Sequence, residues 1–178
     1  MSYIQTLSGK KFNFINPTAA DVDIEDIANA LSNICRFAGH LPEFYSVAQH
    51  SVLSSQIVSP EFAFEALMHD AAEAYCQDVP APLKELLPDY RRIEARVDGL
   101  IREVYGLPEE MSPLVKYADL TMLATERRDL NIDGVTPWPM LDGIPTSGII
   151  DIVPLRPGQA FGMFMARFNE LQELRQCA

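Results

Sequence analysis

Long apolar runs and a secretion signal are both missing from this 178-residue chain. Its longest apolar stretches, such as residues 62–68, are interrupted by Glu65 and fall short of the roughly 20 residues that a membrane span needs. The first ten residues contain no basic segment followed by an apolar run, which a secretory signal would require. We therefore expect a cytoplasmic protein with no membrane partner.

Cysteine is scarce, and its spacing argues against two kinds of site. Cys35, Cys76 and Cys177 are odd in number and far apart in the sequence. Disulfide frameworks and structural zinc sites use paired or closely spaced cysteines. We therefore expect three free thiols and a reducing compartment.

Positive charge is in short supply, because 25 Asp and Glu residues outnumber 14 Lys and Arg residues and give a net charge of −11. Proteins that bind DNA or RNA rely on a basic surface that releases counterions. We therefore expect no nucleic-acid polymer as a partner. A small anionic ligand fits this charge only if a local basic pocket holds it, so individual arginines and lysines are informative.

Most of the chain shows the spacing of apolar residues that is typical of helices. Apolar residues from Ile24 to Ala38 recur at spacings of three and four before Gly39, which predicts a helix from Asp23 to about Ala38. Ser46 and Gln49 have the form of a capping box, which predicts a second helix beginning at Val47. Similar patterns predict four further helices: one from Ser59-Pro60 to about Tyr75, one over residues 93–104 ending near Gly106, one from Ser112-Pro113 ending before Asp133-Gly134, and one over residues 161–171. Because 178 residues suffice for one well-buried core, we predict a single domain over residues 1–178, an all-α compact helical bundle.

Three segments depart from the helical pattern. Residues 3–14 alternate weakly around Ser8-Gly9, a pattern compatible with a short N-terminal β-hairpin. Prolines at positions 80, 82 and 88 predict a connector between helices. Residues 134–157 are rich in proline and contain the single tryptophan, Trp138, which predicts a long irregular excursion.

The residues that indicate chemistry begin with the pair His69-Asp70. Neighbours on a helix diverge by about 100°, yet an imidazole and a carboxylate can still reach one ion above the helix. A dipeptide is a weak signal by itself, since a histidine–aspartate pair at a helix surface is the plainer interpretation. Two further residues strengthen it: His50 in its own predicted helix, and Asp119, an acid among apolar neighbours whose burial is costly unless it is paired or metal-bound. Two imidazoles and two carboxylates suit one divalent ion of Mn²⁺, Co²⁺, Fe²⁺, Ni²⁺ or Zn²⁺.

The order His50, His69-Asp70, Asp119 resembles the signature of the HD-domain phosphohydrolases. The strings at residues 34–40, 45–51 and 73–80 look like the phage and prophage branch of that superfamily, near the bacterial 5'-deoxynucleotidases and the phage deoxynucleoside triphosphate hydrolases. The likeness covers roughly residues 7–174. It implies an all-helical HD-type bundle and a metal-dependent hydrolase of small nucleotides.

The resemblance also implies roles for individual residues. It makes His50, His69, Asp70 and Asp119 the metal ligands. Glu73 matches an acid that works on the nucleophilic water or the leaving oxygen, Arg36 an arginine that holds phosphate, and Asp78 an acid near the sugar. Phe37 stands where the nucleotidases carry a tryptophan that helps to exclude a ribose 2′-hydroxyl, so this chain departs from the family at one residue on which deoxy selectivity is based.

Each of these residues also has a plainer interpretation. Glu73 is then a solvated helix acid, Arg36 a cation favoured at a helix C-terminus, and Asp78 a turn residue. Lys84 and Lys116 are further candidates for phosphate neutralisation, although an exposed lysine is the plainer interpretation of each. Binuclear HD proteins need more histidines than the three in this chain, so the resemblance implies one metal ion. The larger HD triphosphohydrolases use histidines after the HD pair as acid catalysts, and because no histidine follows His69 the resemblance leaves Glu73 as the general acid or base.

Our first hypothesis is therefore hydrolysis of nucleoside 5'-monophosphates, deoxy forms favoured. The alternatives are a deoxynucleoside triphosphate hydrolase that releases triphosphate, and a non-catalytic HD binding or regulatory module of prophage origin. The expected partner is a small nucleotide substrate. The sequence does not decide between a monomer and a homo-oligomer.

Overall fold

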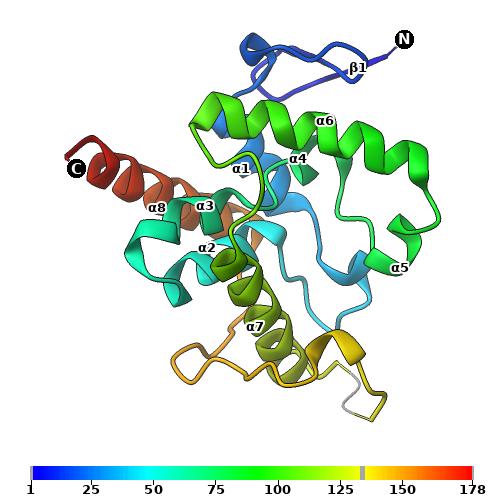
Figure 1. Ribbon diagram of the computed structural model, residues 1–178, viewed down its shortest axis with the longest axis vertical. Helices are drawn as coiled ribbons and strands as arrows, with labels where there is room; N and C mark the ends of the chain where they lie inside the picture. The colour runs from blue at the N-terminus through cyan, green and yellow to red at the C-terminus, as the bar shows by residue number, and fades with distance from the viewer. Residues whose placement is uncertain (1, 133–134, 178) are drawn as a thin grey trace.

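A computed structural model describes residues 2–132 and 135–177, and the fold is all-α with a short N-terminal β-hairpin (Figure 1). The hairpin and helices are β1 (Tyr3–Gln5), β2 (Lys11–Asn13), α1 (Ile24–Asn33), α2 (Val47–Ile57), α3 (Ala63–Met68), α4 (Glu73–Cys76), α5 (Ala81–Lys84), α6 (Pro88–Tyr105), α7 (Pro113–Asp129) and α8 (Pro157–Cys177). Short 3₁₀ turns lie at Ala19–Asp21, Phe37–Gly39, Pro60–Phe62 and Pro139–Leu141. The predicted fold class and the predicted hairpin are confirmed.

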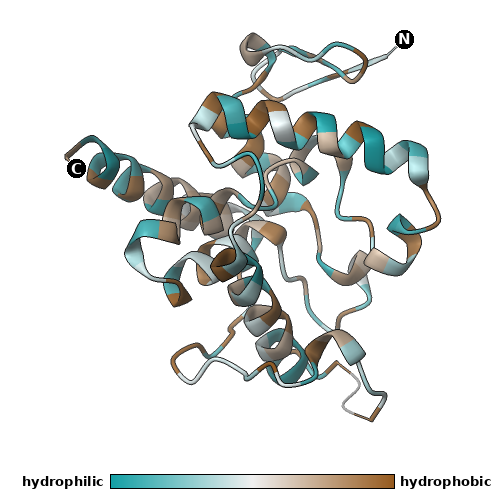
Figure 2. Ribbon diagram, in the orientation of Figure 1, coloured by the Kyte–Doolittle hydropathy of each residue, from teal (hydrophilic) through white to brown (hydrophobic). Residues whose placement is uncertain are grey.

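The core forms around α2, which packs against α1, α3, α7 and α8. Every side chain of α2 from residue 47 to residue 55 is buried, as expected for a helix surrounded by others. The large buried side chains include Phe12, Ile27, Leu31, Leu67, Ile101 and Phe164. Along α6 and α8, hydrophobic and hydrophilic residues alternate, because only one side of each helix faces this core (Figure 2).

The hairpin is attached to helices α1 and α4. Asp26 of α1 accepts hydrogen bonds from the backbone N and the Oγ of Ser8, at 2.7 and 2.6 Å. Phe12 of β2 is fully buried and stacks on Tyr75 of α4, with ring centroids 3.8 Å apart. The N-terminal hairpin therefore packs against α4 through the Phe12 ring.

The start of α2 is confirmed, with one difference in its capping. The Ser46 Oγ accepts a hydrogen bond from the Gln49 backbone N at 3.2 Å, as an N-cap should. The Gln49 side chain does not return to Ser46. It donates from Nε2 to the Val153 carbonyl and accepts at Oε1 from the Leu155 backbone N, at 2.8 and 2.9 Å. The residue expected to complete the cap instead anchors the irregular segment to α2.

The end predicted for the first helix is wrong. The helix ends at Asn33 rather than near Ala38. Residues 34–36 are extended and pair with residues 45–47: the Arg36 N donates to the Tyr45 carbonyl and the Val47 N to the Ile34 carbonyl. This pairing between segments distant in sequence outweighs the local periodicity.

The helix predicted to run from Ser59 to about Tyr75 is interrupted. After α3 ends at Met68, residues 69–72 form turns, and the backbone N of Glu73 bonds to the carbonyl of Asp70 three residues earlier. His69 and Asp70 therefore lie at a break between α3 and α4, not inside one helix.

The remaining predictions differ in smaller ways. Inside the expected connector at residues 80–88, Ala81–Lys84 form the short helix α5, and Pro88 begins α6. Gly106 ends α6 in a left-handed conformation with φ 60°, as predicted. The stop signal Asp133-Gly134 lies outside the described residues. Residues 135–156 are irregular apart from one 3₁₀ turn, and Arg128 of α7 holds them by donating to the carbonyls of Ser147 and Ile150.

Among the described residues, none of the helices is both long enough and apolar enough to cross a lipid bilayer.

Candidate metal centre

The four predicted metal ligands converge from three places in the chain. His50 comes from α2, His69 and Asp70 from the break after α3, and Asp119 from α7. The His50 Nε2 lies 3.3 Å from the His69 Nε2 and 3.4 Å from the Asp119 Oδ1. The Asp70 Oδ2 lies 3.2 Å from the His69 Nε2 and 3.7 Å from the His50 Nε2.

These spacings suit donors around a single ion. Donor atoms about 2.0–2.2 Å from a divalent ion lie roughly 3.0–3.5 Å from one another. One donor atom each from His50, His69 and Asp119 fits within 4.8 Å, and both histidines are buried. The protein thus has a buried group that could bind a metal, and Asp70 borders it. His50, His69, Asp70 and Asp119 are together called the metal group below.

Second contacts fix the orientation of both imidazoles. The His69 Nδ1 lies 2.7 Å from the Ala66 carbonyl oxygen, which can only accept, so Nδ1 carries the proton. The His50 Nδ1 lies 2.5 Å from the Glu126 Oε1 and donates to that carboxylate. Both Nε2 lone pairs therefore point into the same small space, which is the arrangement that metal-ligating histidines adopt.

The electrostatics of the group keep its carboxylates ionised. Burial raises the pKa of Asp70, but the opposing effect of His69 and His50 is larger, so the pKa falls below its usual value. Burial likewise raises the pKa of Asp119, and His50, His69 and Lys116 outweigh that effect. Two ionised carboxylates beside two neutral imidazoles would match a divalent cation in charge.

The pKa values of the two imidazoles are raised, in contrast to those of the carboxylates. Burial and the nearby Arg36 lower the pKa of His50, but Glu126 and Asp119 together raise it to about 9. Burial lowers the pKa of His69 as well, but Asp70 and Asp119 raise it above its usual value. In the absence of another cation, the protein therefore favours the protonated form of both imidazoles. A metal ion would compete with protons for the same lone pairs, so its affinity should rise with pH.

Glu73 is buried beside the group, with only 7% of its surface exposed. Its Oε2 has no hydrogen-bond partner among the described residues. Burial, Asp70 and Asp78 raise the pKa of Glu73 well above its usual value. The plainer interpretation of a solvated helix acid is therefore wrong, and Glu73 can hold a proton next to the site.

Arg36 is also buried, and it is not a cation at a helix C-terminus. Its Nε and Nη2 donate to the Glu126 Oε2 at 3.2 and 3.0 Å, and its Nη1 lies 3.7 Å from the Asp70 Oδ2. Burial lowers the pKa of Arg36, but Glu126, Asp70 and Asp78 raise it above its usual value. The guanidinium stays charged and faces the metal group through Nη1.

Three other predicted residues lie around this centre. Phe37 has φ 55°, unusual for an aromatic residue, and its ring lies 5.5 Å from the Arg36 guanidinium and 6.4 Å from the Trp138 ring. Asp78 is half-buried, and burial raises its pKa. Lys84 places Nζ 2.6 Å from Glu94 and 3.9 Å from the Glu73 Oε1.

Glu126 is the residue that the sequence analysis missed. It is fully buried, and its two oxygens bind His50 and Arg36 separately. In the sequence it begins the charged run Glu126-Arg127-Arg128-Asp129, which suggests a solvated helix end. One signal was available: Glu126 lies two helical turns after Asp119, so both project from the same face of α7.

Comparison with known proteins places the chain in a family. The chain is 65% identical over all 178 residues to the uncharacterized protein YfdR of Escherichia coli (strain K12), and the match covers both proteins completely. The chain belongs to the YfdR family. An uncharacterized protein of Rhodobacter capsulatus is 30% identical to this YfdR-family chain over 122 residues, covering 63% of the chain and 62% of that protein. A scan against models of protein families gives no match.

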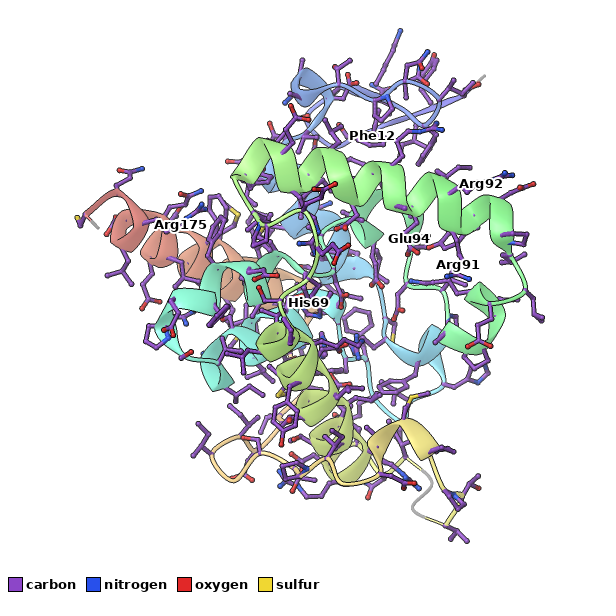
Figure 3. The ribbon with its side chains drawn as sticks, viewed as in Figure 1. Phe12, His69, Arg91, Arg92, Glu94 and Arg175 are labelled. Carbon is purple, nitrogen blue, oxygen red and sulfur yellow. The ribbon has the colours of Figure 1, made fainter. Side chains whose placement is uncertain are left out.

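The metal group of this YfdR-family chain opens onto a cleft of about 640 Å³. His69, Asp70, Glu73 and Asp119 line one side of the cleft, and residues of α6 line the other. Figure 3 shows His69 near the centre of the molecule and Glu94 on the underside of α6. The volume lies in the range of small-molecule binding sites.

Proposed function

We propose that the chain is a metal-dependent phosphohydrolase of small nucleotides and a member of the HD-domain superfamily. The observation that supports this proposal is the convergence of the His50 and His69 Nε2 lone pairs with the ionised Asp70 and Asp119, three of these residues, His69, Asp70 and Asp119, lining a cleft. These residues fit a divalent ion by donor type and by spacing. When bound, such an ion supplies Lewis acidity that polarises a phosphoryl oxygen and activates water.

Glu73 fits the role of the proton-transferring group. Its carboxyl is buried, its pKa is raised well above its usual value by burial, Asp70 and Asp78, and it has one oxygen without a partner among the described residues. A protonated acid beside the reacting phosphoryl group can donate to the leaving oxygen, and its carboxylate form can accept a proton from water. In the proposed mechanism Glu73 acts as the general acid in the first of these two ways.

Arg36 fits the role of a phosphate-binding residue in the same reaction. Glu126 holds Nε and Nη2, so the guanidinium is fixed in orientation, and Nη1 remains on the side of Asp70. In the proposed mechanism this nitrogen donates to a phosphoryl oxygen and offsets its charge. The proposal places Phe37 and Asp78 nearer the nucleoside part of the substrate.

A turnover panel tests the proposed function. The purified chain is incubated with Mn²⁺ or Co²⁺ and with nucleoside mono-, di- and triphosphates, monophosphates being the first class to test, and nucleoside, phosphate and triphosphate products are resolved. We expect hydrolysis that depends on the ion and is abolished by His69→Gln. His40→Gln is the control, since His40 is exposed. A metal-loaded protein that releases no product from any member of the panel would favour the non-catalytic module.

A further inference from the structure

The far side of the cleft is formed by α5 and α6 and carries several cations. Lys84 of α5 and Arg91, Arg92 and Arg102 of α6 line it, opposite the metal group. The cleft is also lined by five acidic residues, Asp70, Glu73, Glu94, Asp98 and Asp119. An anion in this cleft therefore needs a cation whose charge no neighbouring carboxylate offsets.

Most of these cations already have an acidic partner. The Lys84 Nζ lies 2.6 Å from Glu94, and Lys116, at the α7 edge of the cleft, lies 2.7 Å from Asp119. The remaining pairs are Arg102 with Asp98, at 2.7 Å, and Arg92 with Asp89. A cation engaged in this way gives little net attraction to a ligand, since its field is offset by the neighbouring carboxylate.

Arg91 differs from these residues. Among the described residues it has no carboxylate within ion-pair distance and no side-chain hydrogen bond, although it lines the cleft. Figure 3 shows its side chain extending from α6 toward the space between α5 and the centre of the molecule, on the same side of α6 as Glu94. Its guanidinium donors are available to a ligand in the cleft.

We propose that Arg91 forms an anion subsite for a phosphate group other than the one attacked at the metal centre. The inference rests on the proposed function, and it names the substrate class as nucleotides with two or more phosphates. Arg36 and Arg91 approach the cleft region differently: Arg36 lies behind Asp70 and is held by Glu126, whereas Arg91 belongs to the opposite wall. A monophosphate beside the metal would use the Arg36 side only. A phosphate chain continuing across the cleft would reach the guanidinium that lacks a protein partner.

Binding of two inorganic probes to the metal-loaded chain tests this subsite. The affinities of inorganic phosphate and inorganic triphosphate are measured by calorimetry, with Mn²⁺ in the same excess over ligand for every variant so that chelation is identical. Arg91→Gln should weaken triphosphate binding by about tenfold or more, which is about 1.4 kcal/mol, and change phosphate binding by less than about twofold. Arg91→Lys should recover part of the loss, because it restores the charge without the planar fork.

Arg156→Gln is the matched control. Arg156 is exposed, lies just before α8, and does not line the cleft, so it makes the same change in net charge at a remote place. It should alter neither affinity by more than about twofold. The inference is overturned if Arg91→Gln behaves like Arg156→Gln, or if it weakens phosphate and triphosphate equally.

The same variants separate this inference from the proposed function. If Arg91→Gln loses triphosphate affinity selectively while the turnover panel yields no product, the subsite stands and the hydrolase proposal fails. If the panel shows metal-dependent hydrolysis and Arg91→Gln binds triphosphate normally, the hydrolase proposal stands and the subsite fails.

Discussion

Glu126 joins two residues of the candidate site through one buried carboxylate. Burial raises its pKa, but Arg36 and His50 lower it below the usual value, so the group is ionised. Its two oxygens fix the His50 imidazole and the Arg36 guanidinium at once. Glu126 is therefore a positioning residue, because it acts on the site through the side chains it orients.

Glu126→Gln tests this role. The amide keeps the volume but removes the charge that holds the His50 Nδ1 proton, so the affinity for Mn²⁺ or Co²⁺ should fall by about 10- to 100-fold. Glu65→Gln is the matched control: Glu65 is a buried carboxylate that accepts from Ser112, and among the described residues it bonds to none of the four candidate ligands. Both variants should lose thermal stability, but only Glu126→Gln should lose metal affinity. Equal metal affinities in the two variants would contradict the positioning role.

Glu73→Gln separates catalysis from stability. Turnover in the panel should fall by about 10²–10⁴-fold while metal content stays unchanged, since Glu73 is a proton-transferring group and not a ligand. The folded-state pKa of Glu73 is raised, so the wild-type chain loses stability as the pH rises above the unfolded value of about 4.5. The variant lacks this loss, and its advantage in Tm should be larger at pH 7 than at pH 4.5. Full activity in Glu73→Gln would require another proton donor.

At the scale of secondary-structure elements, helix boundaries set by local signals are predictable from the sequence, and boundaries set by distant contacts are not. Ser46 marks the start of α2 because a cap depends on atoms a few residues apart. The end of α1 at Asn33 depends on pairing with residues 45–47, which local periodicity does not contain. The break after Met68 is similar, because Gly and Pro are absent there and only the packed structure reveals the turns.

The same contrast applies to the candidate site. The four candidate ligands could be singled out from the sequence, since their residue types and order resemble a known signature. The buried bridge of Glu126 could not be singled out, because its burial depends on how α7 packs against α2. The ion-pair partners of the cleft cations could not be predicted either, because Lys84 and Glu94 are brought together by the turn between α5 and α6.

Gln49→Leu tests the link between α2 and the irregular segment. The change leaves the Val153 carbonyl and the Leu155 N–H without their partner, which should cost about 1–2 kcal/mol and lower Tm by roughly 2–4 °C per kcal/mol. Gln159→Leu is the control, because Gln159 is exposed and bonds only to the nearby Arg156 N. Its cost should stay within about 0.5 kcal/mol. Equal Tm values for the two variants would show that the link adds no stability.

At the scale of the whole molecule, the candidate metal centre ties together α2, the break after α3, and α7. An ion that binds only the folded chain should stabilise it by about 2.7 kcal/mol at a concentration of 100 Kd. We expect Mn²⁺, Co²⁺ or Zn²⁺ to raise Tm by roughly 5–10 °C, measured by calorimetry. Asp119→Asn should remove most of this gain. A wild-type chain whose Tm does not respond to any of these ions would remove the basis of the metal centre.

The hydrogen bond between His50 and Glu126 joins residues 76 positions apart. During synthesis the N-terminal part of a chain emerges first, so α2 and the His69-Asp70 turn leave the ribosome well before α7. A nascent chain that has not yet released α7 lacks both Asp119 and the carboxylate that orients His50. An ion held by all four candidate ligands would therefore require that α7 has docked against α2, and its retention by the protein would report that docking.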